Sequence, residues 1–370
     1  MPLPTPWELL NTLATRLVAR RLTGQTVVII GGSRGLGLDL ARQLGAAGCK
    51  LAICARDARE VERAHDELIR TGAAVYAQPC DATQPDQVEH FIGATMRRFG
   101  SLDMLITCAA NIQVGPLDTV SESDISAALE QILWSAYYPT MAVLPHMRAR
   151  KAGRIVHISS LGGKLGLPHM LPYCTAKFAL TGFSASLRAE VAQDGVAVTT
   201  ITPGLLRTGA HVNAPFKGQR EKEYLWFSAG ASLPLVSLPS QTAARRILCA
   251  VARGDAESTL TSGVRLLVIA NALAPKLVSR LLSLQNRMLP SAEGGSLQAL
   301  RGMDVAAQSS SRLVHALDDY GRANAREHDQ YPGPLDSVLG VRAESLSASG
   351  TRTSLPTPST LIRATAHTSG

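Results

Sequence analysis

Short apolar runs alternate with longer segments of helical periodicity between residues 26 and 262. The runs lie at 27–30, 50–54, 73–77, 102–107, 154–158, 196–201 and 257–262. Apolar residues recur at spacings of three and four in the segments between them, at 36–44, 57–71, 84–99, 122–150, 173–193 and 241–254. Continuously apolar strands that alternate with helices predict a parallel sheet covered on both faces. Right-handed crossovers then make a doubly wound α/β fold of about seven strands, in a single domain over residues 23–262.

Two segments with amphipathic, helical patterns flank this domain. Residues 1–22 place apolar side chains at helical spacing and end in basic residues, and residues 263–304 form a C-terminal helical extension. Within the extension, residues 264–290 are apolar with four spaced cations, and Pro275 should kink or split the helix. Each segment either packs on its own domain or lies on a membrane surface, and the pattern leaves both interpretations open.

Two other segments depart from the alternating pattern. Residues 205–240 follow a strand end and hold a charged stretch and then three aromatic residues, which is typical of a lid over a pocket. Beyond about residue 305 the apolar signal is lost, and 12 of the 30 residues from 341 to 370 are Ser or Thr. Such a composition buries too little apolar surface to offset chain entropy, so we expect residues 305–370 to be disordered.

Charge and cysteine content narrow the class of protein. The net charge is +8, but Lys and Arg are dispersed, which favours a solvated basic surface, and no nucleic-acid-binding motif occurs. No run of about 18 uncharged apolar residues predicts a spanning helix. The six cysteines form no C-x-x-C pair, no cluster has metal-ligand spacing, and the N-terminal pattern is not that of a secretory signal. We therefore expect no metal and a cytoplasmic protein, with association at the cytoplasmic face of a membrane as an alternative.

A glycine-rich turn directly follows the first apolar run and opens the first helix. It reads Gly31-Gly32-Ser33-Arg34-Gly35-Leu36-Gly37. A strand–turn–helix context is what a phosphate-binding turn requires, because glycines let the backbone approach a pyrophosphate and the helix N-terminus offers N–H groups. We therefore expect a dinucleotide to contact this turn, at Gly31, Ser33, Arg34, Gly35, Leu36 and Gly37.

The end of the second apolar run favours NADP(H) over NAD(H). A carboxylate at this position would hold the ribose 2′-hydroxyl of NAD, whereas this chain has Ala55 followed by Arg56. Arg34 in the glycine turn supplies a second guanidinium, and paired Arg donors suit a 2′-phosphate. The alternative is that Arg56 is a solvated loop residue, neutralised by the neighbouring Asp57.

Three polar residues at fixed spacings indicate acid–base chemistry. Lys177 follows Tyr173 by four residues, so the two share one helix face, and Ser160 lies thirteen residues before Tyr173 at the end of a strand. The ammonium of Lys177 and a cationic nicotinamide should lower the pKa of the phenol from about 10. Tyr173 could then exchange a proton with a carbonyl or alcohol oxygen that Ser160 holds by a hydrogen bond.

Together these motifs resemble the short-chain dehydrogenase/reductase (SDR) family over roughly residues 22–262. The residues that match are Gly31, Gly35, Gly37, Cys80-Asp81-Ala82, Ser160, Tyr173, Lys177, Pro203-Gly204 and Thr208. The resemblance implies a seven-stranded Rossmann domain and hydride transfer between a nicotinamide and a carbonyl or alcohol carbon. It also implies further cofactor contacts: Asp81 and Ala82 at the adenine, Ala109 and Tyr173 along the cofactor, Lys177 at the nicotinamide ribose, and Pro203, Gly204 and Thr208 at the nicotinamide end.

The chain departs from the family pattern at two places. Where the family usually has Asn-Asn-Ala-Gly after the fourth strand, this chain has Thr107-Cys108-Ala109-Ala110. Many members also place an Asn in the helix before the catalytic strand, where this chain has Ile132. Because Ile cannot hydrogen-bond, either Gln131 or Ser135 replaces the Asn in a proton relay from Lys177, or the relay is arranged differently, or the activity is low.

Two histidines lie near the predicted catalytic groups. We interpret His157, inside the catalytic strand, as a packed or exposed strand residue. His169 lies in the loop 164–172, which is expected to border the substrate, and either contacts the substrate or has a structural role.

The predicted substrate is a hydrophobic carbonyl or secondary alcohol. The segments around Ser160 and Tyr173 resemble the steroid- and lipid-directed branch of the family, and the expected lid is apolar. Two other functions remain open: an NADP-binding scaffold or sensor with weak or no catalysis, and a peripheral membrane protein. The resemblance further implies a homodimer or homotetramer that pairs through the helices 122–150 and 173–193.

Overall fold

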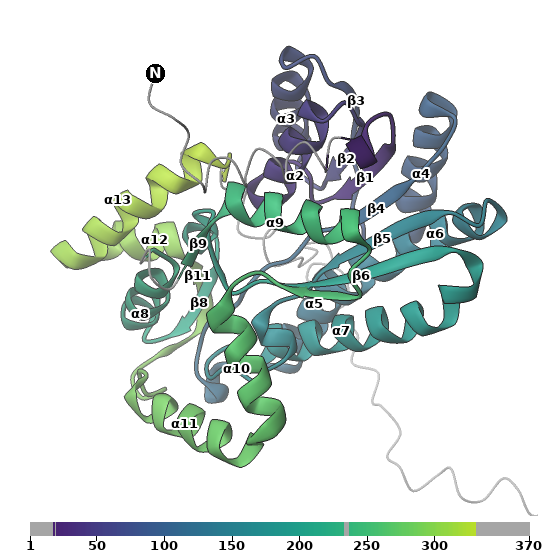
Figure 1. The fold of residues 1–370 in the computed structure, drawn as a ribbon. Helices are drawn as coiled ribbons and strands as arrows, with labels where there is room; N and C mark the ends of the chain where they lie inside the picture. The colour runs from purple at the N-terminus through teal and green to yellow at the C-terminus, as the bar shows by residue number, and fades with distance from the viewer. Residues whose placement is uncertain (1–17, 19, 233–236, 331–370) are drawn as a thin grey trace, which may run out of the picture. The chain divides into compact units, whose positions relative to one another are not determined.

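Seven parallel strands form the central sheet of the computed structural model, which describes residues 18, 20–232 and 237–330 (Figure 1). Their order across the sheet is β10-β6-β5-β4-β1-β2-β3. The strands are β1 (Thr26–Ile30), β2 (Lys50–Ala55), β3 (Ala74–Pro79), β4 (Met104–Thr107), β5 (Gly153–Ile158), β6 (Val196–Thr202) and β10 (Glu257–Thr259). Each lies within three residues of an apolar run predicted above, and the order reverses direction at β1, as in a doubly wound fold. The predicted fold class is confirmed.

Helices cover both faces of the sheet. One face packs against α2 (Gly35–Ala46), α3 (Ala58–Arg70) and α9 (Ser240–Arg253). The other packs against α4 (Pro85–Phe99), α6 (Ser135–Ala149) and α7 (Leu171–Val191). Successive residues of β1 alternate between the two cores, with Val27 and Ile29 in the first and Val28 and Ile30 in the second. This two-sided burial is why the strands are apolar throughout.

The expected helix 122–150 is interrupted by one turn of π-helix. It consists of α5 (Glu122–Leu129), the π-helical turn η2 (Glu130–Trp134) and then α6. Ser121 caps α5 through a reciprocal side-chain and backbone bond with Asp124. Such π-turns inside α-helices often occur at functional sites.

The segment expected to form a lid folds into short elements beyond the carboxyl ends of the strands. They are β7 (Leu205–Arg207), η5 (Ala210–Val212), β8 (Pro215–Gly218), α8 (Arg220–Ser232) and β9 (Ser237–Pro239). A third apolar cluster lies under them, in which Phe216 packs edge-on against Tyr224 at 5.4 Å between ring centroids. The same cluster includes Ile132, Ala136 and Tyr173, so it joins the lid segment to η2, α6 and α7.

The C-terminal region differs from its prediction in two respects. Within the expected helical extension, α10 (Ser262–Leu273) and α11 (Pro275–Met288) meet at Pro275 with a bend of 119°, but Ser296–Arg301 is a strand, β11, antiparallel to β8. Residues 305–330 were expected to be disordered, yet they contain the end of α12 (Gly302–Gln308) and all of α13 (Arg312–Glu327). These helices are ordered because Val305, Ala306 and Val314 are buried in the third cluster. The disorder prediction is therefore corrected for 305–330, and residues 331–370 lie outside the described part.

The predicted N-terminal helix and the helix pair α10–α11 flank the central domain. At the end of the predicted N-terminal helix, Val18 and Leu22 are buried in the first core, and residues 1–17 and 19 lie outside the described residues. Among described helices, none taken singly is long and apolar enough to cross a membrane; α10 and α11 meet that criterion only when counted as a bent pair.

Candidate active site

A pocket of about 660 Å³ lies at the carboxyl ends of the sheet strands, the usual ligand position in doubly wound folds. All the residues predicted to bind cofactor or catalyse line this one pocket. They are Gly31, Ser33, Arg34, Gly35, Leu36, Gly37, Arg56, Asp81, Ala82, Ala109, Ser160, Tyr173, Lys177, Pro203, Gly204 and Thr208. Its volume is in the range of cofactor and ligand sites. The structure thus brings together side chains that are spread over most of the sequence.

The glycine turn has a shape that only glycine permits. Gly31 has φ +79°, and a Cβ there would lie 2.9 Å from the backbone nitrogen of Ala109. A Cβ on Gly37 would lie 2.0 Å from the carbonyl oxygen of Gly31. No side chain caps the N-terminus of α2. This close-packed turn at the start of an uncapped helix fits the pyrophosphate of a dinucleotide.

The adenosine end of the pocket contains a carboxylate that sequence reasoning missed. Glu60, in the first turn of α3, accepts hydrogen bonds from Arg34 Nη1 at 2.8 Å and from Ser33 Oγ at 3.2 Å. Burial of Glu60 raises the pKa of its carboxyl group. Arg34 is therefore already paired with a buried acid, which the argument for a 2′-phosphate site did not include. The sequence signal was an acidic residue at the start of the helix that follows the second strand.

Three further residues lie at the adenosine end of the pocket: Arg56, Asp57 and Asp81. Arg56 is exposed at the pocket edge. Asp57, expected to neutralise it, instead caps α3 by accepting from the backbone nitrogens of Arg59 and Glu60. Asp81 Oδ1 accepts from the backbone nitrogen of Thr83 at 3.0 Å, which fixes the Asp81 side chain beside the pocket.

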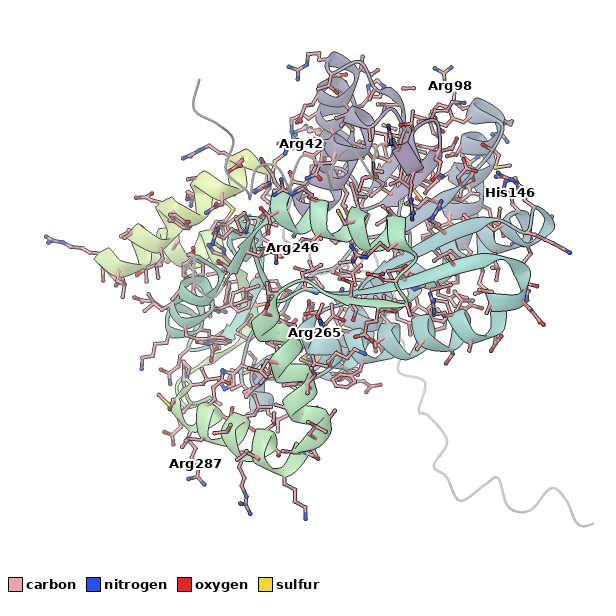
Figure 2. The ribbon with its side chains drawn as sticks, viewed as in Figure 1. Arg42, Arg98, His146, Arg246, Arg265 and Arg287 are labelled. Atoms are coloured by element: carbon pink, nitrogen blue, oxygen red, sulfur yellow. The ribbon has the colours of Figure 1, made fainter. Side chains whose placement is uncertain are left out.

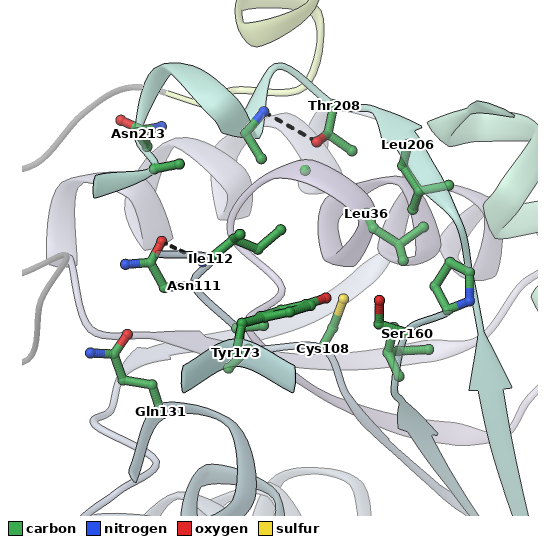
Figure 3. A pocket seen from close by; sticks show the side chains of 18 of the residues that line it. Leu36, Cys108, Asn111, Ile112, Gln131, Ser160, Tyr173, Leu206, Thr208 and Asn213 are labelled. Atoms are coloured by element: carbon green, nitrogen blue, oxygen red, sulfur yellow. Dashed lines mark hydrogen bonds between the residues drawn. The ribbon is translucent and has the colours of Figure 1, made fainter. Parts of the chain in front are cut away.

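The three predicted catalytic groups meet at the centre of the pocket. The Tyr173 hydroxyl lies beside Ser160, whose Oγ accepts a hydrogen bond from the backbone nitrogen of Gly162 at 3.1 Å (Figure 3). Lys177 Nζ lies 5.7 Å from the centroid of the Tyr173 ring and donates to the carbonyl of Ile158 at 2.8 Å. Figure 3 shows the hydroxyls of Tyr173 and Ser160 pointing to the same part of the pocket, beside the Cys108 sulfur.

Burial changes the protonation of these groups from the sequence expectation. Burial raises the pKa of Tyr173 well above its usual value, and this outweighs the lowering by the Ser160 hydrogen bond. Burial also lowers the pKa of Lys177 to about 8. Lys177 alone therefore does not lower the pKa of Tyr173, and the lowering predicted with a cationic nicotinamide close by stays a prediction. Tyr173 is a protonated acid at neutral pH, and a cation next to it is needed to reverse the shift.

Cys108 is a further pocket residue without a sequence prediction of its own. Its thiol pKa is raised to about 12 by burial, partly offset by the nearby Lys177. It is therefore an un-ionised, apolar neighbour of Tyr173. The small side chain occupies a position at which the resembled family usually has an Asn, so this part of the pocket lacks an amide.

Neither expected substitute for the relay Asn bonds to Lys177 in the described part of the chain. Ile132 is fully buried in the third cluster, inside the π-turn. Gln131 and Ser135 both line the pocket, but Ser135 Oγ donates to the carbonyl of Gln131 at 2.7 Å. The π-turn thus brings two polar side chains to the pocket while Ile132 turns into the core.

The two histidines have structural partners. His157 is buried, and its Nε2 lies 3.0 Å from Thr140 Oγ1, in agreement with its interpretation as a packed residue. His169 Nδ1 lies 2.8 Å from Glu223 Oε1, and Trp226 Nε1 donates to the other oxygen of Glu223 at 2.7 Å. His169 therefore anchors the lid helix α8, and it is absent from the pocket lining, in contrast to the proposed substrate contact.

The side of the pocket opposite the glycine turn is apolar. It is lined by residues of the loop before α7, of the lid segment and of α10 and α11: Leu167, Met170, Leu206, Trp226, Phe227, Leu267 and Leu282. Thr208 Oγ1 accepts from the backbone nitrogen of Ala210, which holds the start of the lid segment (Figure 3). Gln330, from the segment predicted to be disordered, also lines the pocket. The described residues include no cluster of side chains able to hold a metal ion.

Comparisons with known proteins agree with this geometry. The family model described as short chain dehydrogenase matches residues 25–216. "Dehydrogenase/reductase SDR family protein 7-like" of Anopheles gambiae is 36% identical over 213 residues, which are 56% of this chain and 67% of that protein. "Granaticin polyketide synthase putative ketoacyl reductase 1" of Streptomyces violaceoruber is 32% identical, over 49% of this chain and 67% of that protein.

A solved structure shares the fold. The crystal structure of a short chain dehydrogenase/reductase from Burkholderia phymatum, in complex with NAD, superposes with a TM-score of 0.64. It covers 70% of this chain and 96% of the other, at 21% sequence identity. At that identity the likeness concerns the architecture of the sheet and its helices.

Proposed function

Because the chain belongs to the short-chain dehydrogenase/reductase family, we propose that it is an oxidoreductase that transfers hydride between NADP(H) and a hydrophobic carbonyl or secondary alcohol. The observation that carries the proposal is the meeting of Ser160, Tyr173 and Lys177 in one pocket with a glycine turn. The carbon that accepts or gives hydride would lie next to the Tyr173 hydroxyl.

The residues of the pocket have separable roles in this proposal. The cofactor, when bound, supplies or accepts the hydride. The glycine turn, Asp81 and Ala82 would hold its adenosine and pyrophosphate, and Ala109, Pro203, Gly204, Thr208 and Lys177 its nicotinamide half. In carbonyl reduction Tyr173 donates its proton to the substrate oxygen and Ser160 holds that oxygen by a hydrogen bond. Binding both reactants in one pocket lowers the barrier by orienting them.

The preference for NADP(H) is supported by the absence of a carboxylate at Ala55 and by the two guanidinium groups of Arg34 and Arg56 at the pocket edge. Arg56→Ala should weaken NADPH binding roughly tenfold, a change of about 1.4 kcal/mol, and leave NADH binding unchanged. Arg59→Ala, at an exposed position in the first turn of α3, is the control. Equal losses for both cofactors would contradict the preference.

The first experiment measures NADPH oxidation with carbonyls graded from small and polar to long-chain and steroidal. Wild type is compared with Tyr173→Phe, which removes the proton donor and keeps the ring. Turnover of an apolar carbonyl that falls by three or more orders of magnitude in the variant, with NADPH affinity kept, is the expected result. NADPH binding without turnover of any carbonyl would instead favour the scaffold or sensor function.

We also propose that the helix pair α10–α11 lies on an anionic membrane surface. Its outer side exposes large apolar side chains: Leu266, Ile269, Leu273, Leu277, Leu281, Leu284 and Met288. Residues 262–288 contain four cations and no acidic residue, and Figure 2 marks Arg265 and Arg287 on this pair. Apolar and basic side chains together suit an interface with anionic lipid. Leu267 and Leu282 of the same helices line the pocket, so a lipid-soluble substrate could reach it from the bilayer.

Vesicle sedimentation tests the membrane proposal. Wild type should bind vesicles that contain phosphatidylserine more tightly than vesicles of phosphatidylcholine alone, and high salt should weaken this binding. The double variant Leu273→Glu/Leu277→Glu should lose it. The control Leu117→Glu/Leu313→Glu changes two exposed leucines elsewhere and should bind as wild type does. Binding that is unchanged by the first variant, or absent in wild type, would contradict the proposal. The cytoplasmic location and the homo-oligomeric state stay predictions.

A further inference from the structure

The residues that follow α13 lie against the pocket and contact the glycine turn. We call residues 327–330 the C-terminal strap. The backbone nitrogen of Gly35, at the uncapped N-terminus of α2, donates to the carbonyl oxygen of His328 at 2.7 Å. The His328 ring lies 3.0 Å from Asp39 Oδ2, and both side chains are buried. The strap is thus seated on the element expected to bind the cofactor pyrophosphate.

Gln330 continues the strap into the pocket. A Cβ placed on Gly35 would lie 2.5 Å from Gln330 Nε2. The side-chain amide of Gln330 therefore occupies the space that any larger residue at position 35 would need. On the opposite side, Asn213 Nδ2 donates to the backbone and side-chain oxygens of Gln330 at 3.2 and 3.3 Å. The strap therefore bridges the glycine turn and the lid segment.

The helix that carries the strap is held independently of it. A Cβ on Gly321 would lie 2.2 Å from His211 Nε2, and a Cβ on Gly209 would lie 2.4 Å from the backbone nitrogen of Ala325. The Tyr224 hydroxyl also bonds to Asp318 at 3.1 Å. These contacts fix α13 to the lid segment, so the strap can leave the turn without unfolding the helix.

One residue of the strap has an unusual backbone conformation. Asp329 has φ +51°, a left-handed conformation that is uncommon for a residue other than glycine. Its carboxylate pairs with Arg63 at 3.3 Å, and the Arg63 side chain is exposed, so this ion pair contributes little. Such backbone strain often occurs at sites where a segment changes conformation.

We propose that the C-terminal strap competes with the cofactor for the glycine turn and lowers cofactor affinity. The physical reason is that the His328 carbonyl and a pyrophosphate oxygen are both acceptors, and one N–H of Gly35 serves one of them at a time. An acceptor oxygen at this place would also repel the phosphate charge. The inference rests on the proposed cofactor site and adds a regulatory element to it: the strap must be displaced before the cofactor is fully bound.

Two truncations test the competition through cofactor affinity alone. The chain ending at Glu327 lacks the strap, and the chain ending at Gln330 keeps it and lacks only the residues that follow. NADPH affinity, measured by fluorescence, should be about tenfold higher for the shorter chain, as expected when the closed strap occupies roughly nine tenths of the free protein. The chain ending at Gln330 should bind as the full chain does. Equal or lower affinity in the shorter chain would overturn the competition.

Hydrogen exchange on the full chain provides a test that needs no truncation. The backbone nitrogen of Gln330 donates to Ala325 at 2.7 Å, so displacement of the strap should expose it. Saturating NADPH should increase exchange at residues 328–330 and decrease it at residues 31–37. Slower exchange of the strap with NADPH would show a clamp and overturn the proposal. If no chain, truncated or full, binds NADPH or NADH, the proposed cofactor site fails, and the strap proposal fails with it.

Discussion

At the level of single residues, burial decides the chemistry of the pocket. The spacing of Tyr173 and Lys177 predicts a phenol with a lowered pKa. This spacing shows that Lys177 lies near Tyr173, but it does not show how deeply the surrounding protein buries both groups. In the structure both groups are buried, which raises the pKa of Tyr173 and lowers that of Lys177 to about 8. In the proposed reaction, reduction uses a protonated Tyr173 and oxidation an ionised one, so the rate of alcohol oxidation should increase toward higher pH.

The lowered pKa of Lys177 predicts how stability depends on pH. Between about 8 and 10.5, the unfolded chain binds a proton that the folded chain has lost, so the free energy of unfolding rises with pH in this window. Wild type should therefore gain about 2 kcal/mol relative to Lys177→Met as pH increases from 8 to 10. Urea unfolding at several pH values measures this difference. For the control Lys222→Met, at an exposed site, the free energy of unfolding should change with pH as it does in wild type. If Lys177→Met also changed with pH as wild type does, the prediction would be contradicted.

The Arg34–Glu60 pair predicts a change in cofactor affinity. The buried Glu60 carboxylate pairs with Arg34, one of the two guanidinium groups proposed to bind the 2′-phosphate. Glu60→Gln should therefore tighten NADPH binding by roughly tenfold, about 1.4 kcal/mol, and change NADH binding much less. Isothermal titration of both cofactors measures the ratio. Glu62→Gln makes the same charge change at an exposed position of α3 and should leave both affinities unaltered; weaker NADPH binding in Glu60→Gln would exclude this role.

At the level of elements, the C-terminal helix α13 shows what a composition argument misses. Its buried positions are Val314, Asp318, Gly321 and Ala325, which recur at helical spacing. One is charged and two are very small, so a search for apolar periodicity does not find them. They are buried because His211 and Tyr224 of the lid segment supply the complementary surface. The sequence does show a helical spacing of these positions, but that spacing can be interpreted only once the packing surface of the lid segment is known.

The close contact of α13 predicts a destabilising glycine substitution. In Gly321→Ala the new Cβ would lie 2.2 Å from His211 Nε2, so the buried imidazole or the helix must move. The free energy of unfolding should be about 1–3 kcal/mol lower than in wild type, as for other overpacked sites. The matched control is Gly182→Ala in α7, where no atom lies within 4 Å and alanine should stabilise by about 0.5–1 kcal/mol. Thermal and urea unfolding of both variants distinguish the two signs, and equal effects would contradict the packing argument.

The helix before the catalytic strand gives a second example at this scale. Its sequence predicts one continuous helix, but the structure has a π-turn at Glu130–Trp134. The extra residue in this turn directs Gln131 and Ser135 to the pocket and leaves Ile132 buried. Local propensity does not identify such a turn, because it depends on how the third apolar cluster packs against both halves of the helix.

At the level of the whole molecule, the pocket joins parts that are distant in the chain. Its walls come from the glycine turn, from the ends of most strands, from the lid segment and from α10 and α11. A ligand that binds there contacts the sheet and the lid together. The first and second cores hold the sheet and its helices, while the third cluster holds the lid and α13. Cofactor binding should therefore stabilise the described molecule as one unit.

This connection predicts the effect of cofactor on global stability. NADPH at about 100 times its dissociation constant should add about 2.7 kcal/mol to the free energy of unfolding. Fluorescence and circular dichroism should report one shared transition, displaced to higher urea concentration. Tyr173→Phe should show the same displacement, because the phenol is not needed for cofactor binding. A transition that splits, with only one part displaced, would show that the lid segment and the sheet unfold separately.

The fold and the main site motifs follow from local sequence pattern. Strands buried on both faces must be apolar along their whole length, so their positions in the chain can be predicted from the sequence without a structure. The glycine turn and the i, i+4 relation of Tyr173 and Lys177 are also short-range features, since they depend on a few adjacent residues. For the same reason the family resemblance was visible, and the residues it implied line a single pocket.

The remaining features depend on contacts between residues far apart in the chain. Glu60 pairs with Arg34, the strap reaches Gly35 from the other end of the chain, and burial raises the pKa of Tyr173. None of these can be inferred from local periodicity, because each depends on which surface the fold places opposite a given side chain. The sequence therefore specified the strands and the chemical groups, and tertiary packing decided their protonation, their partners and the order of the C-terminal helices.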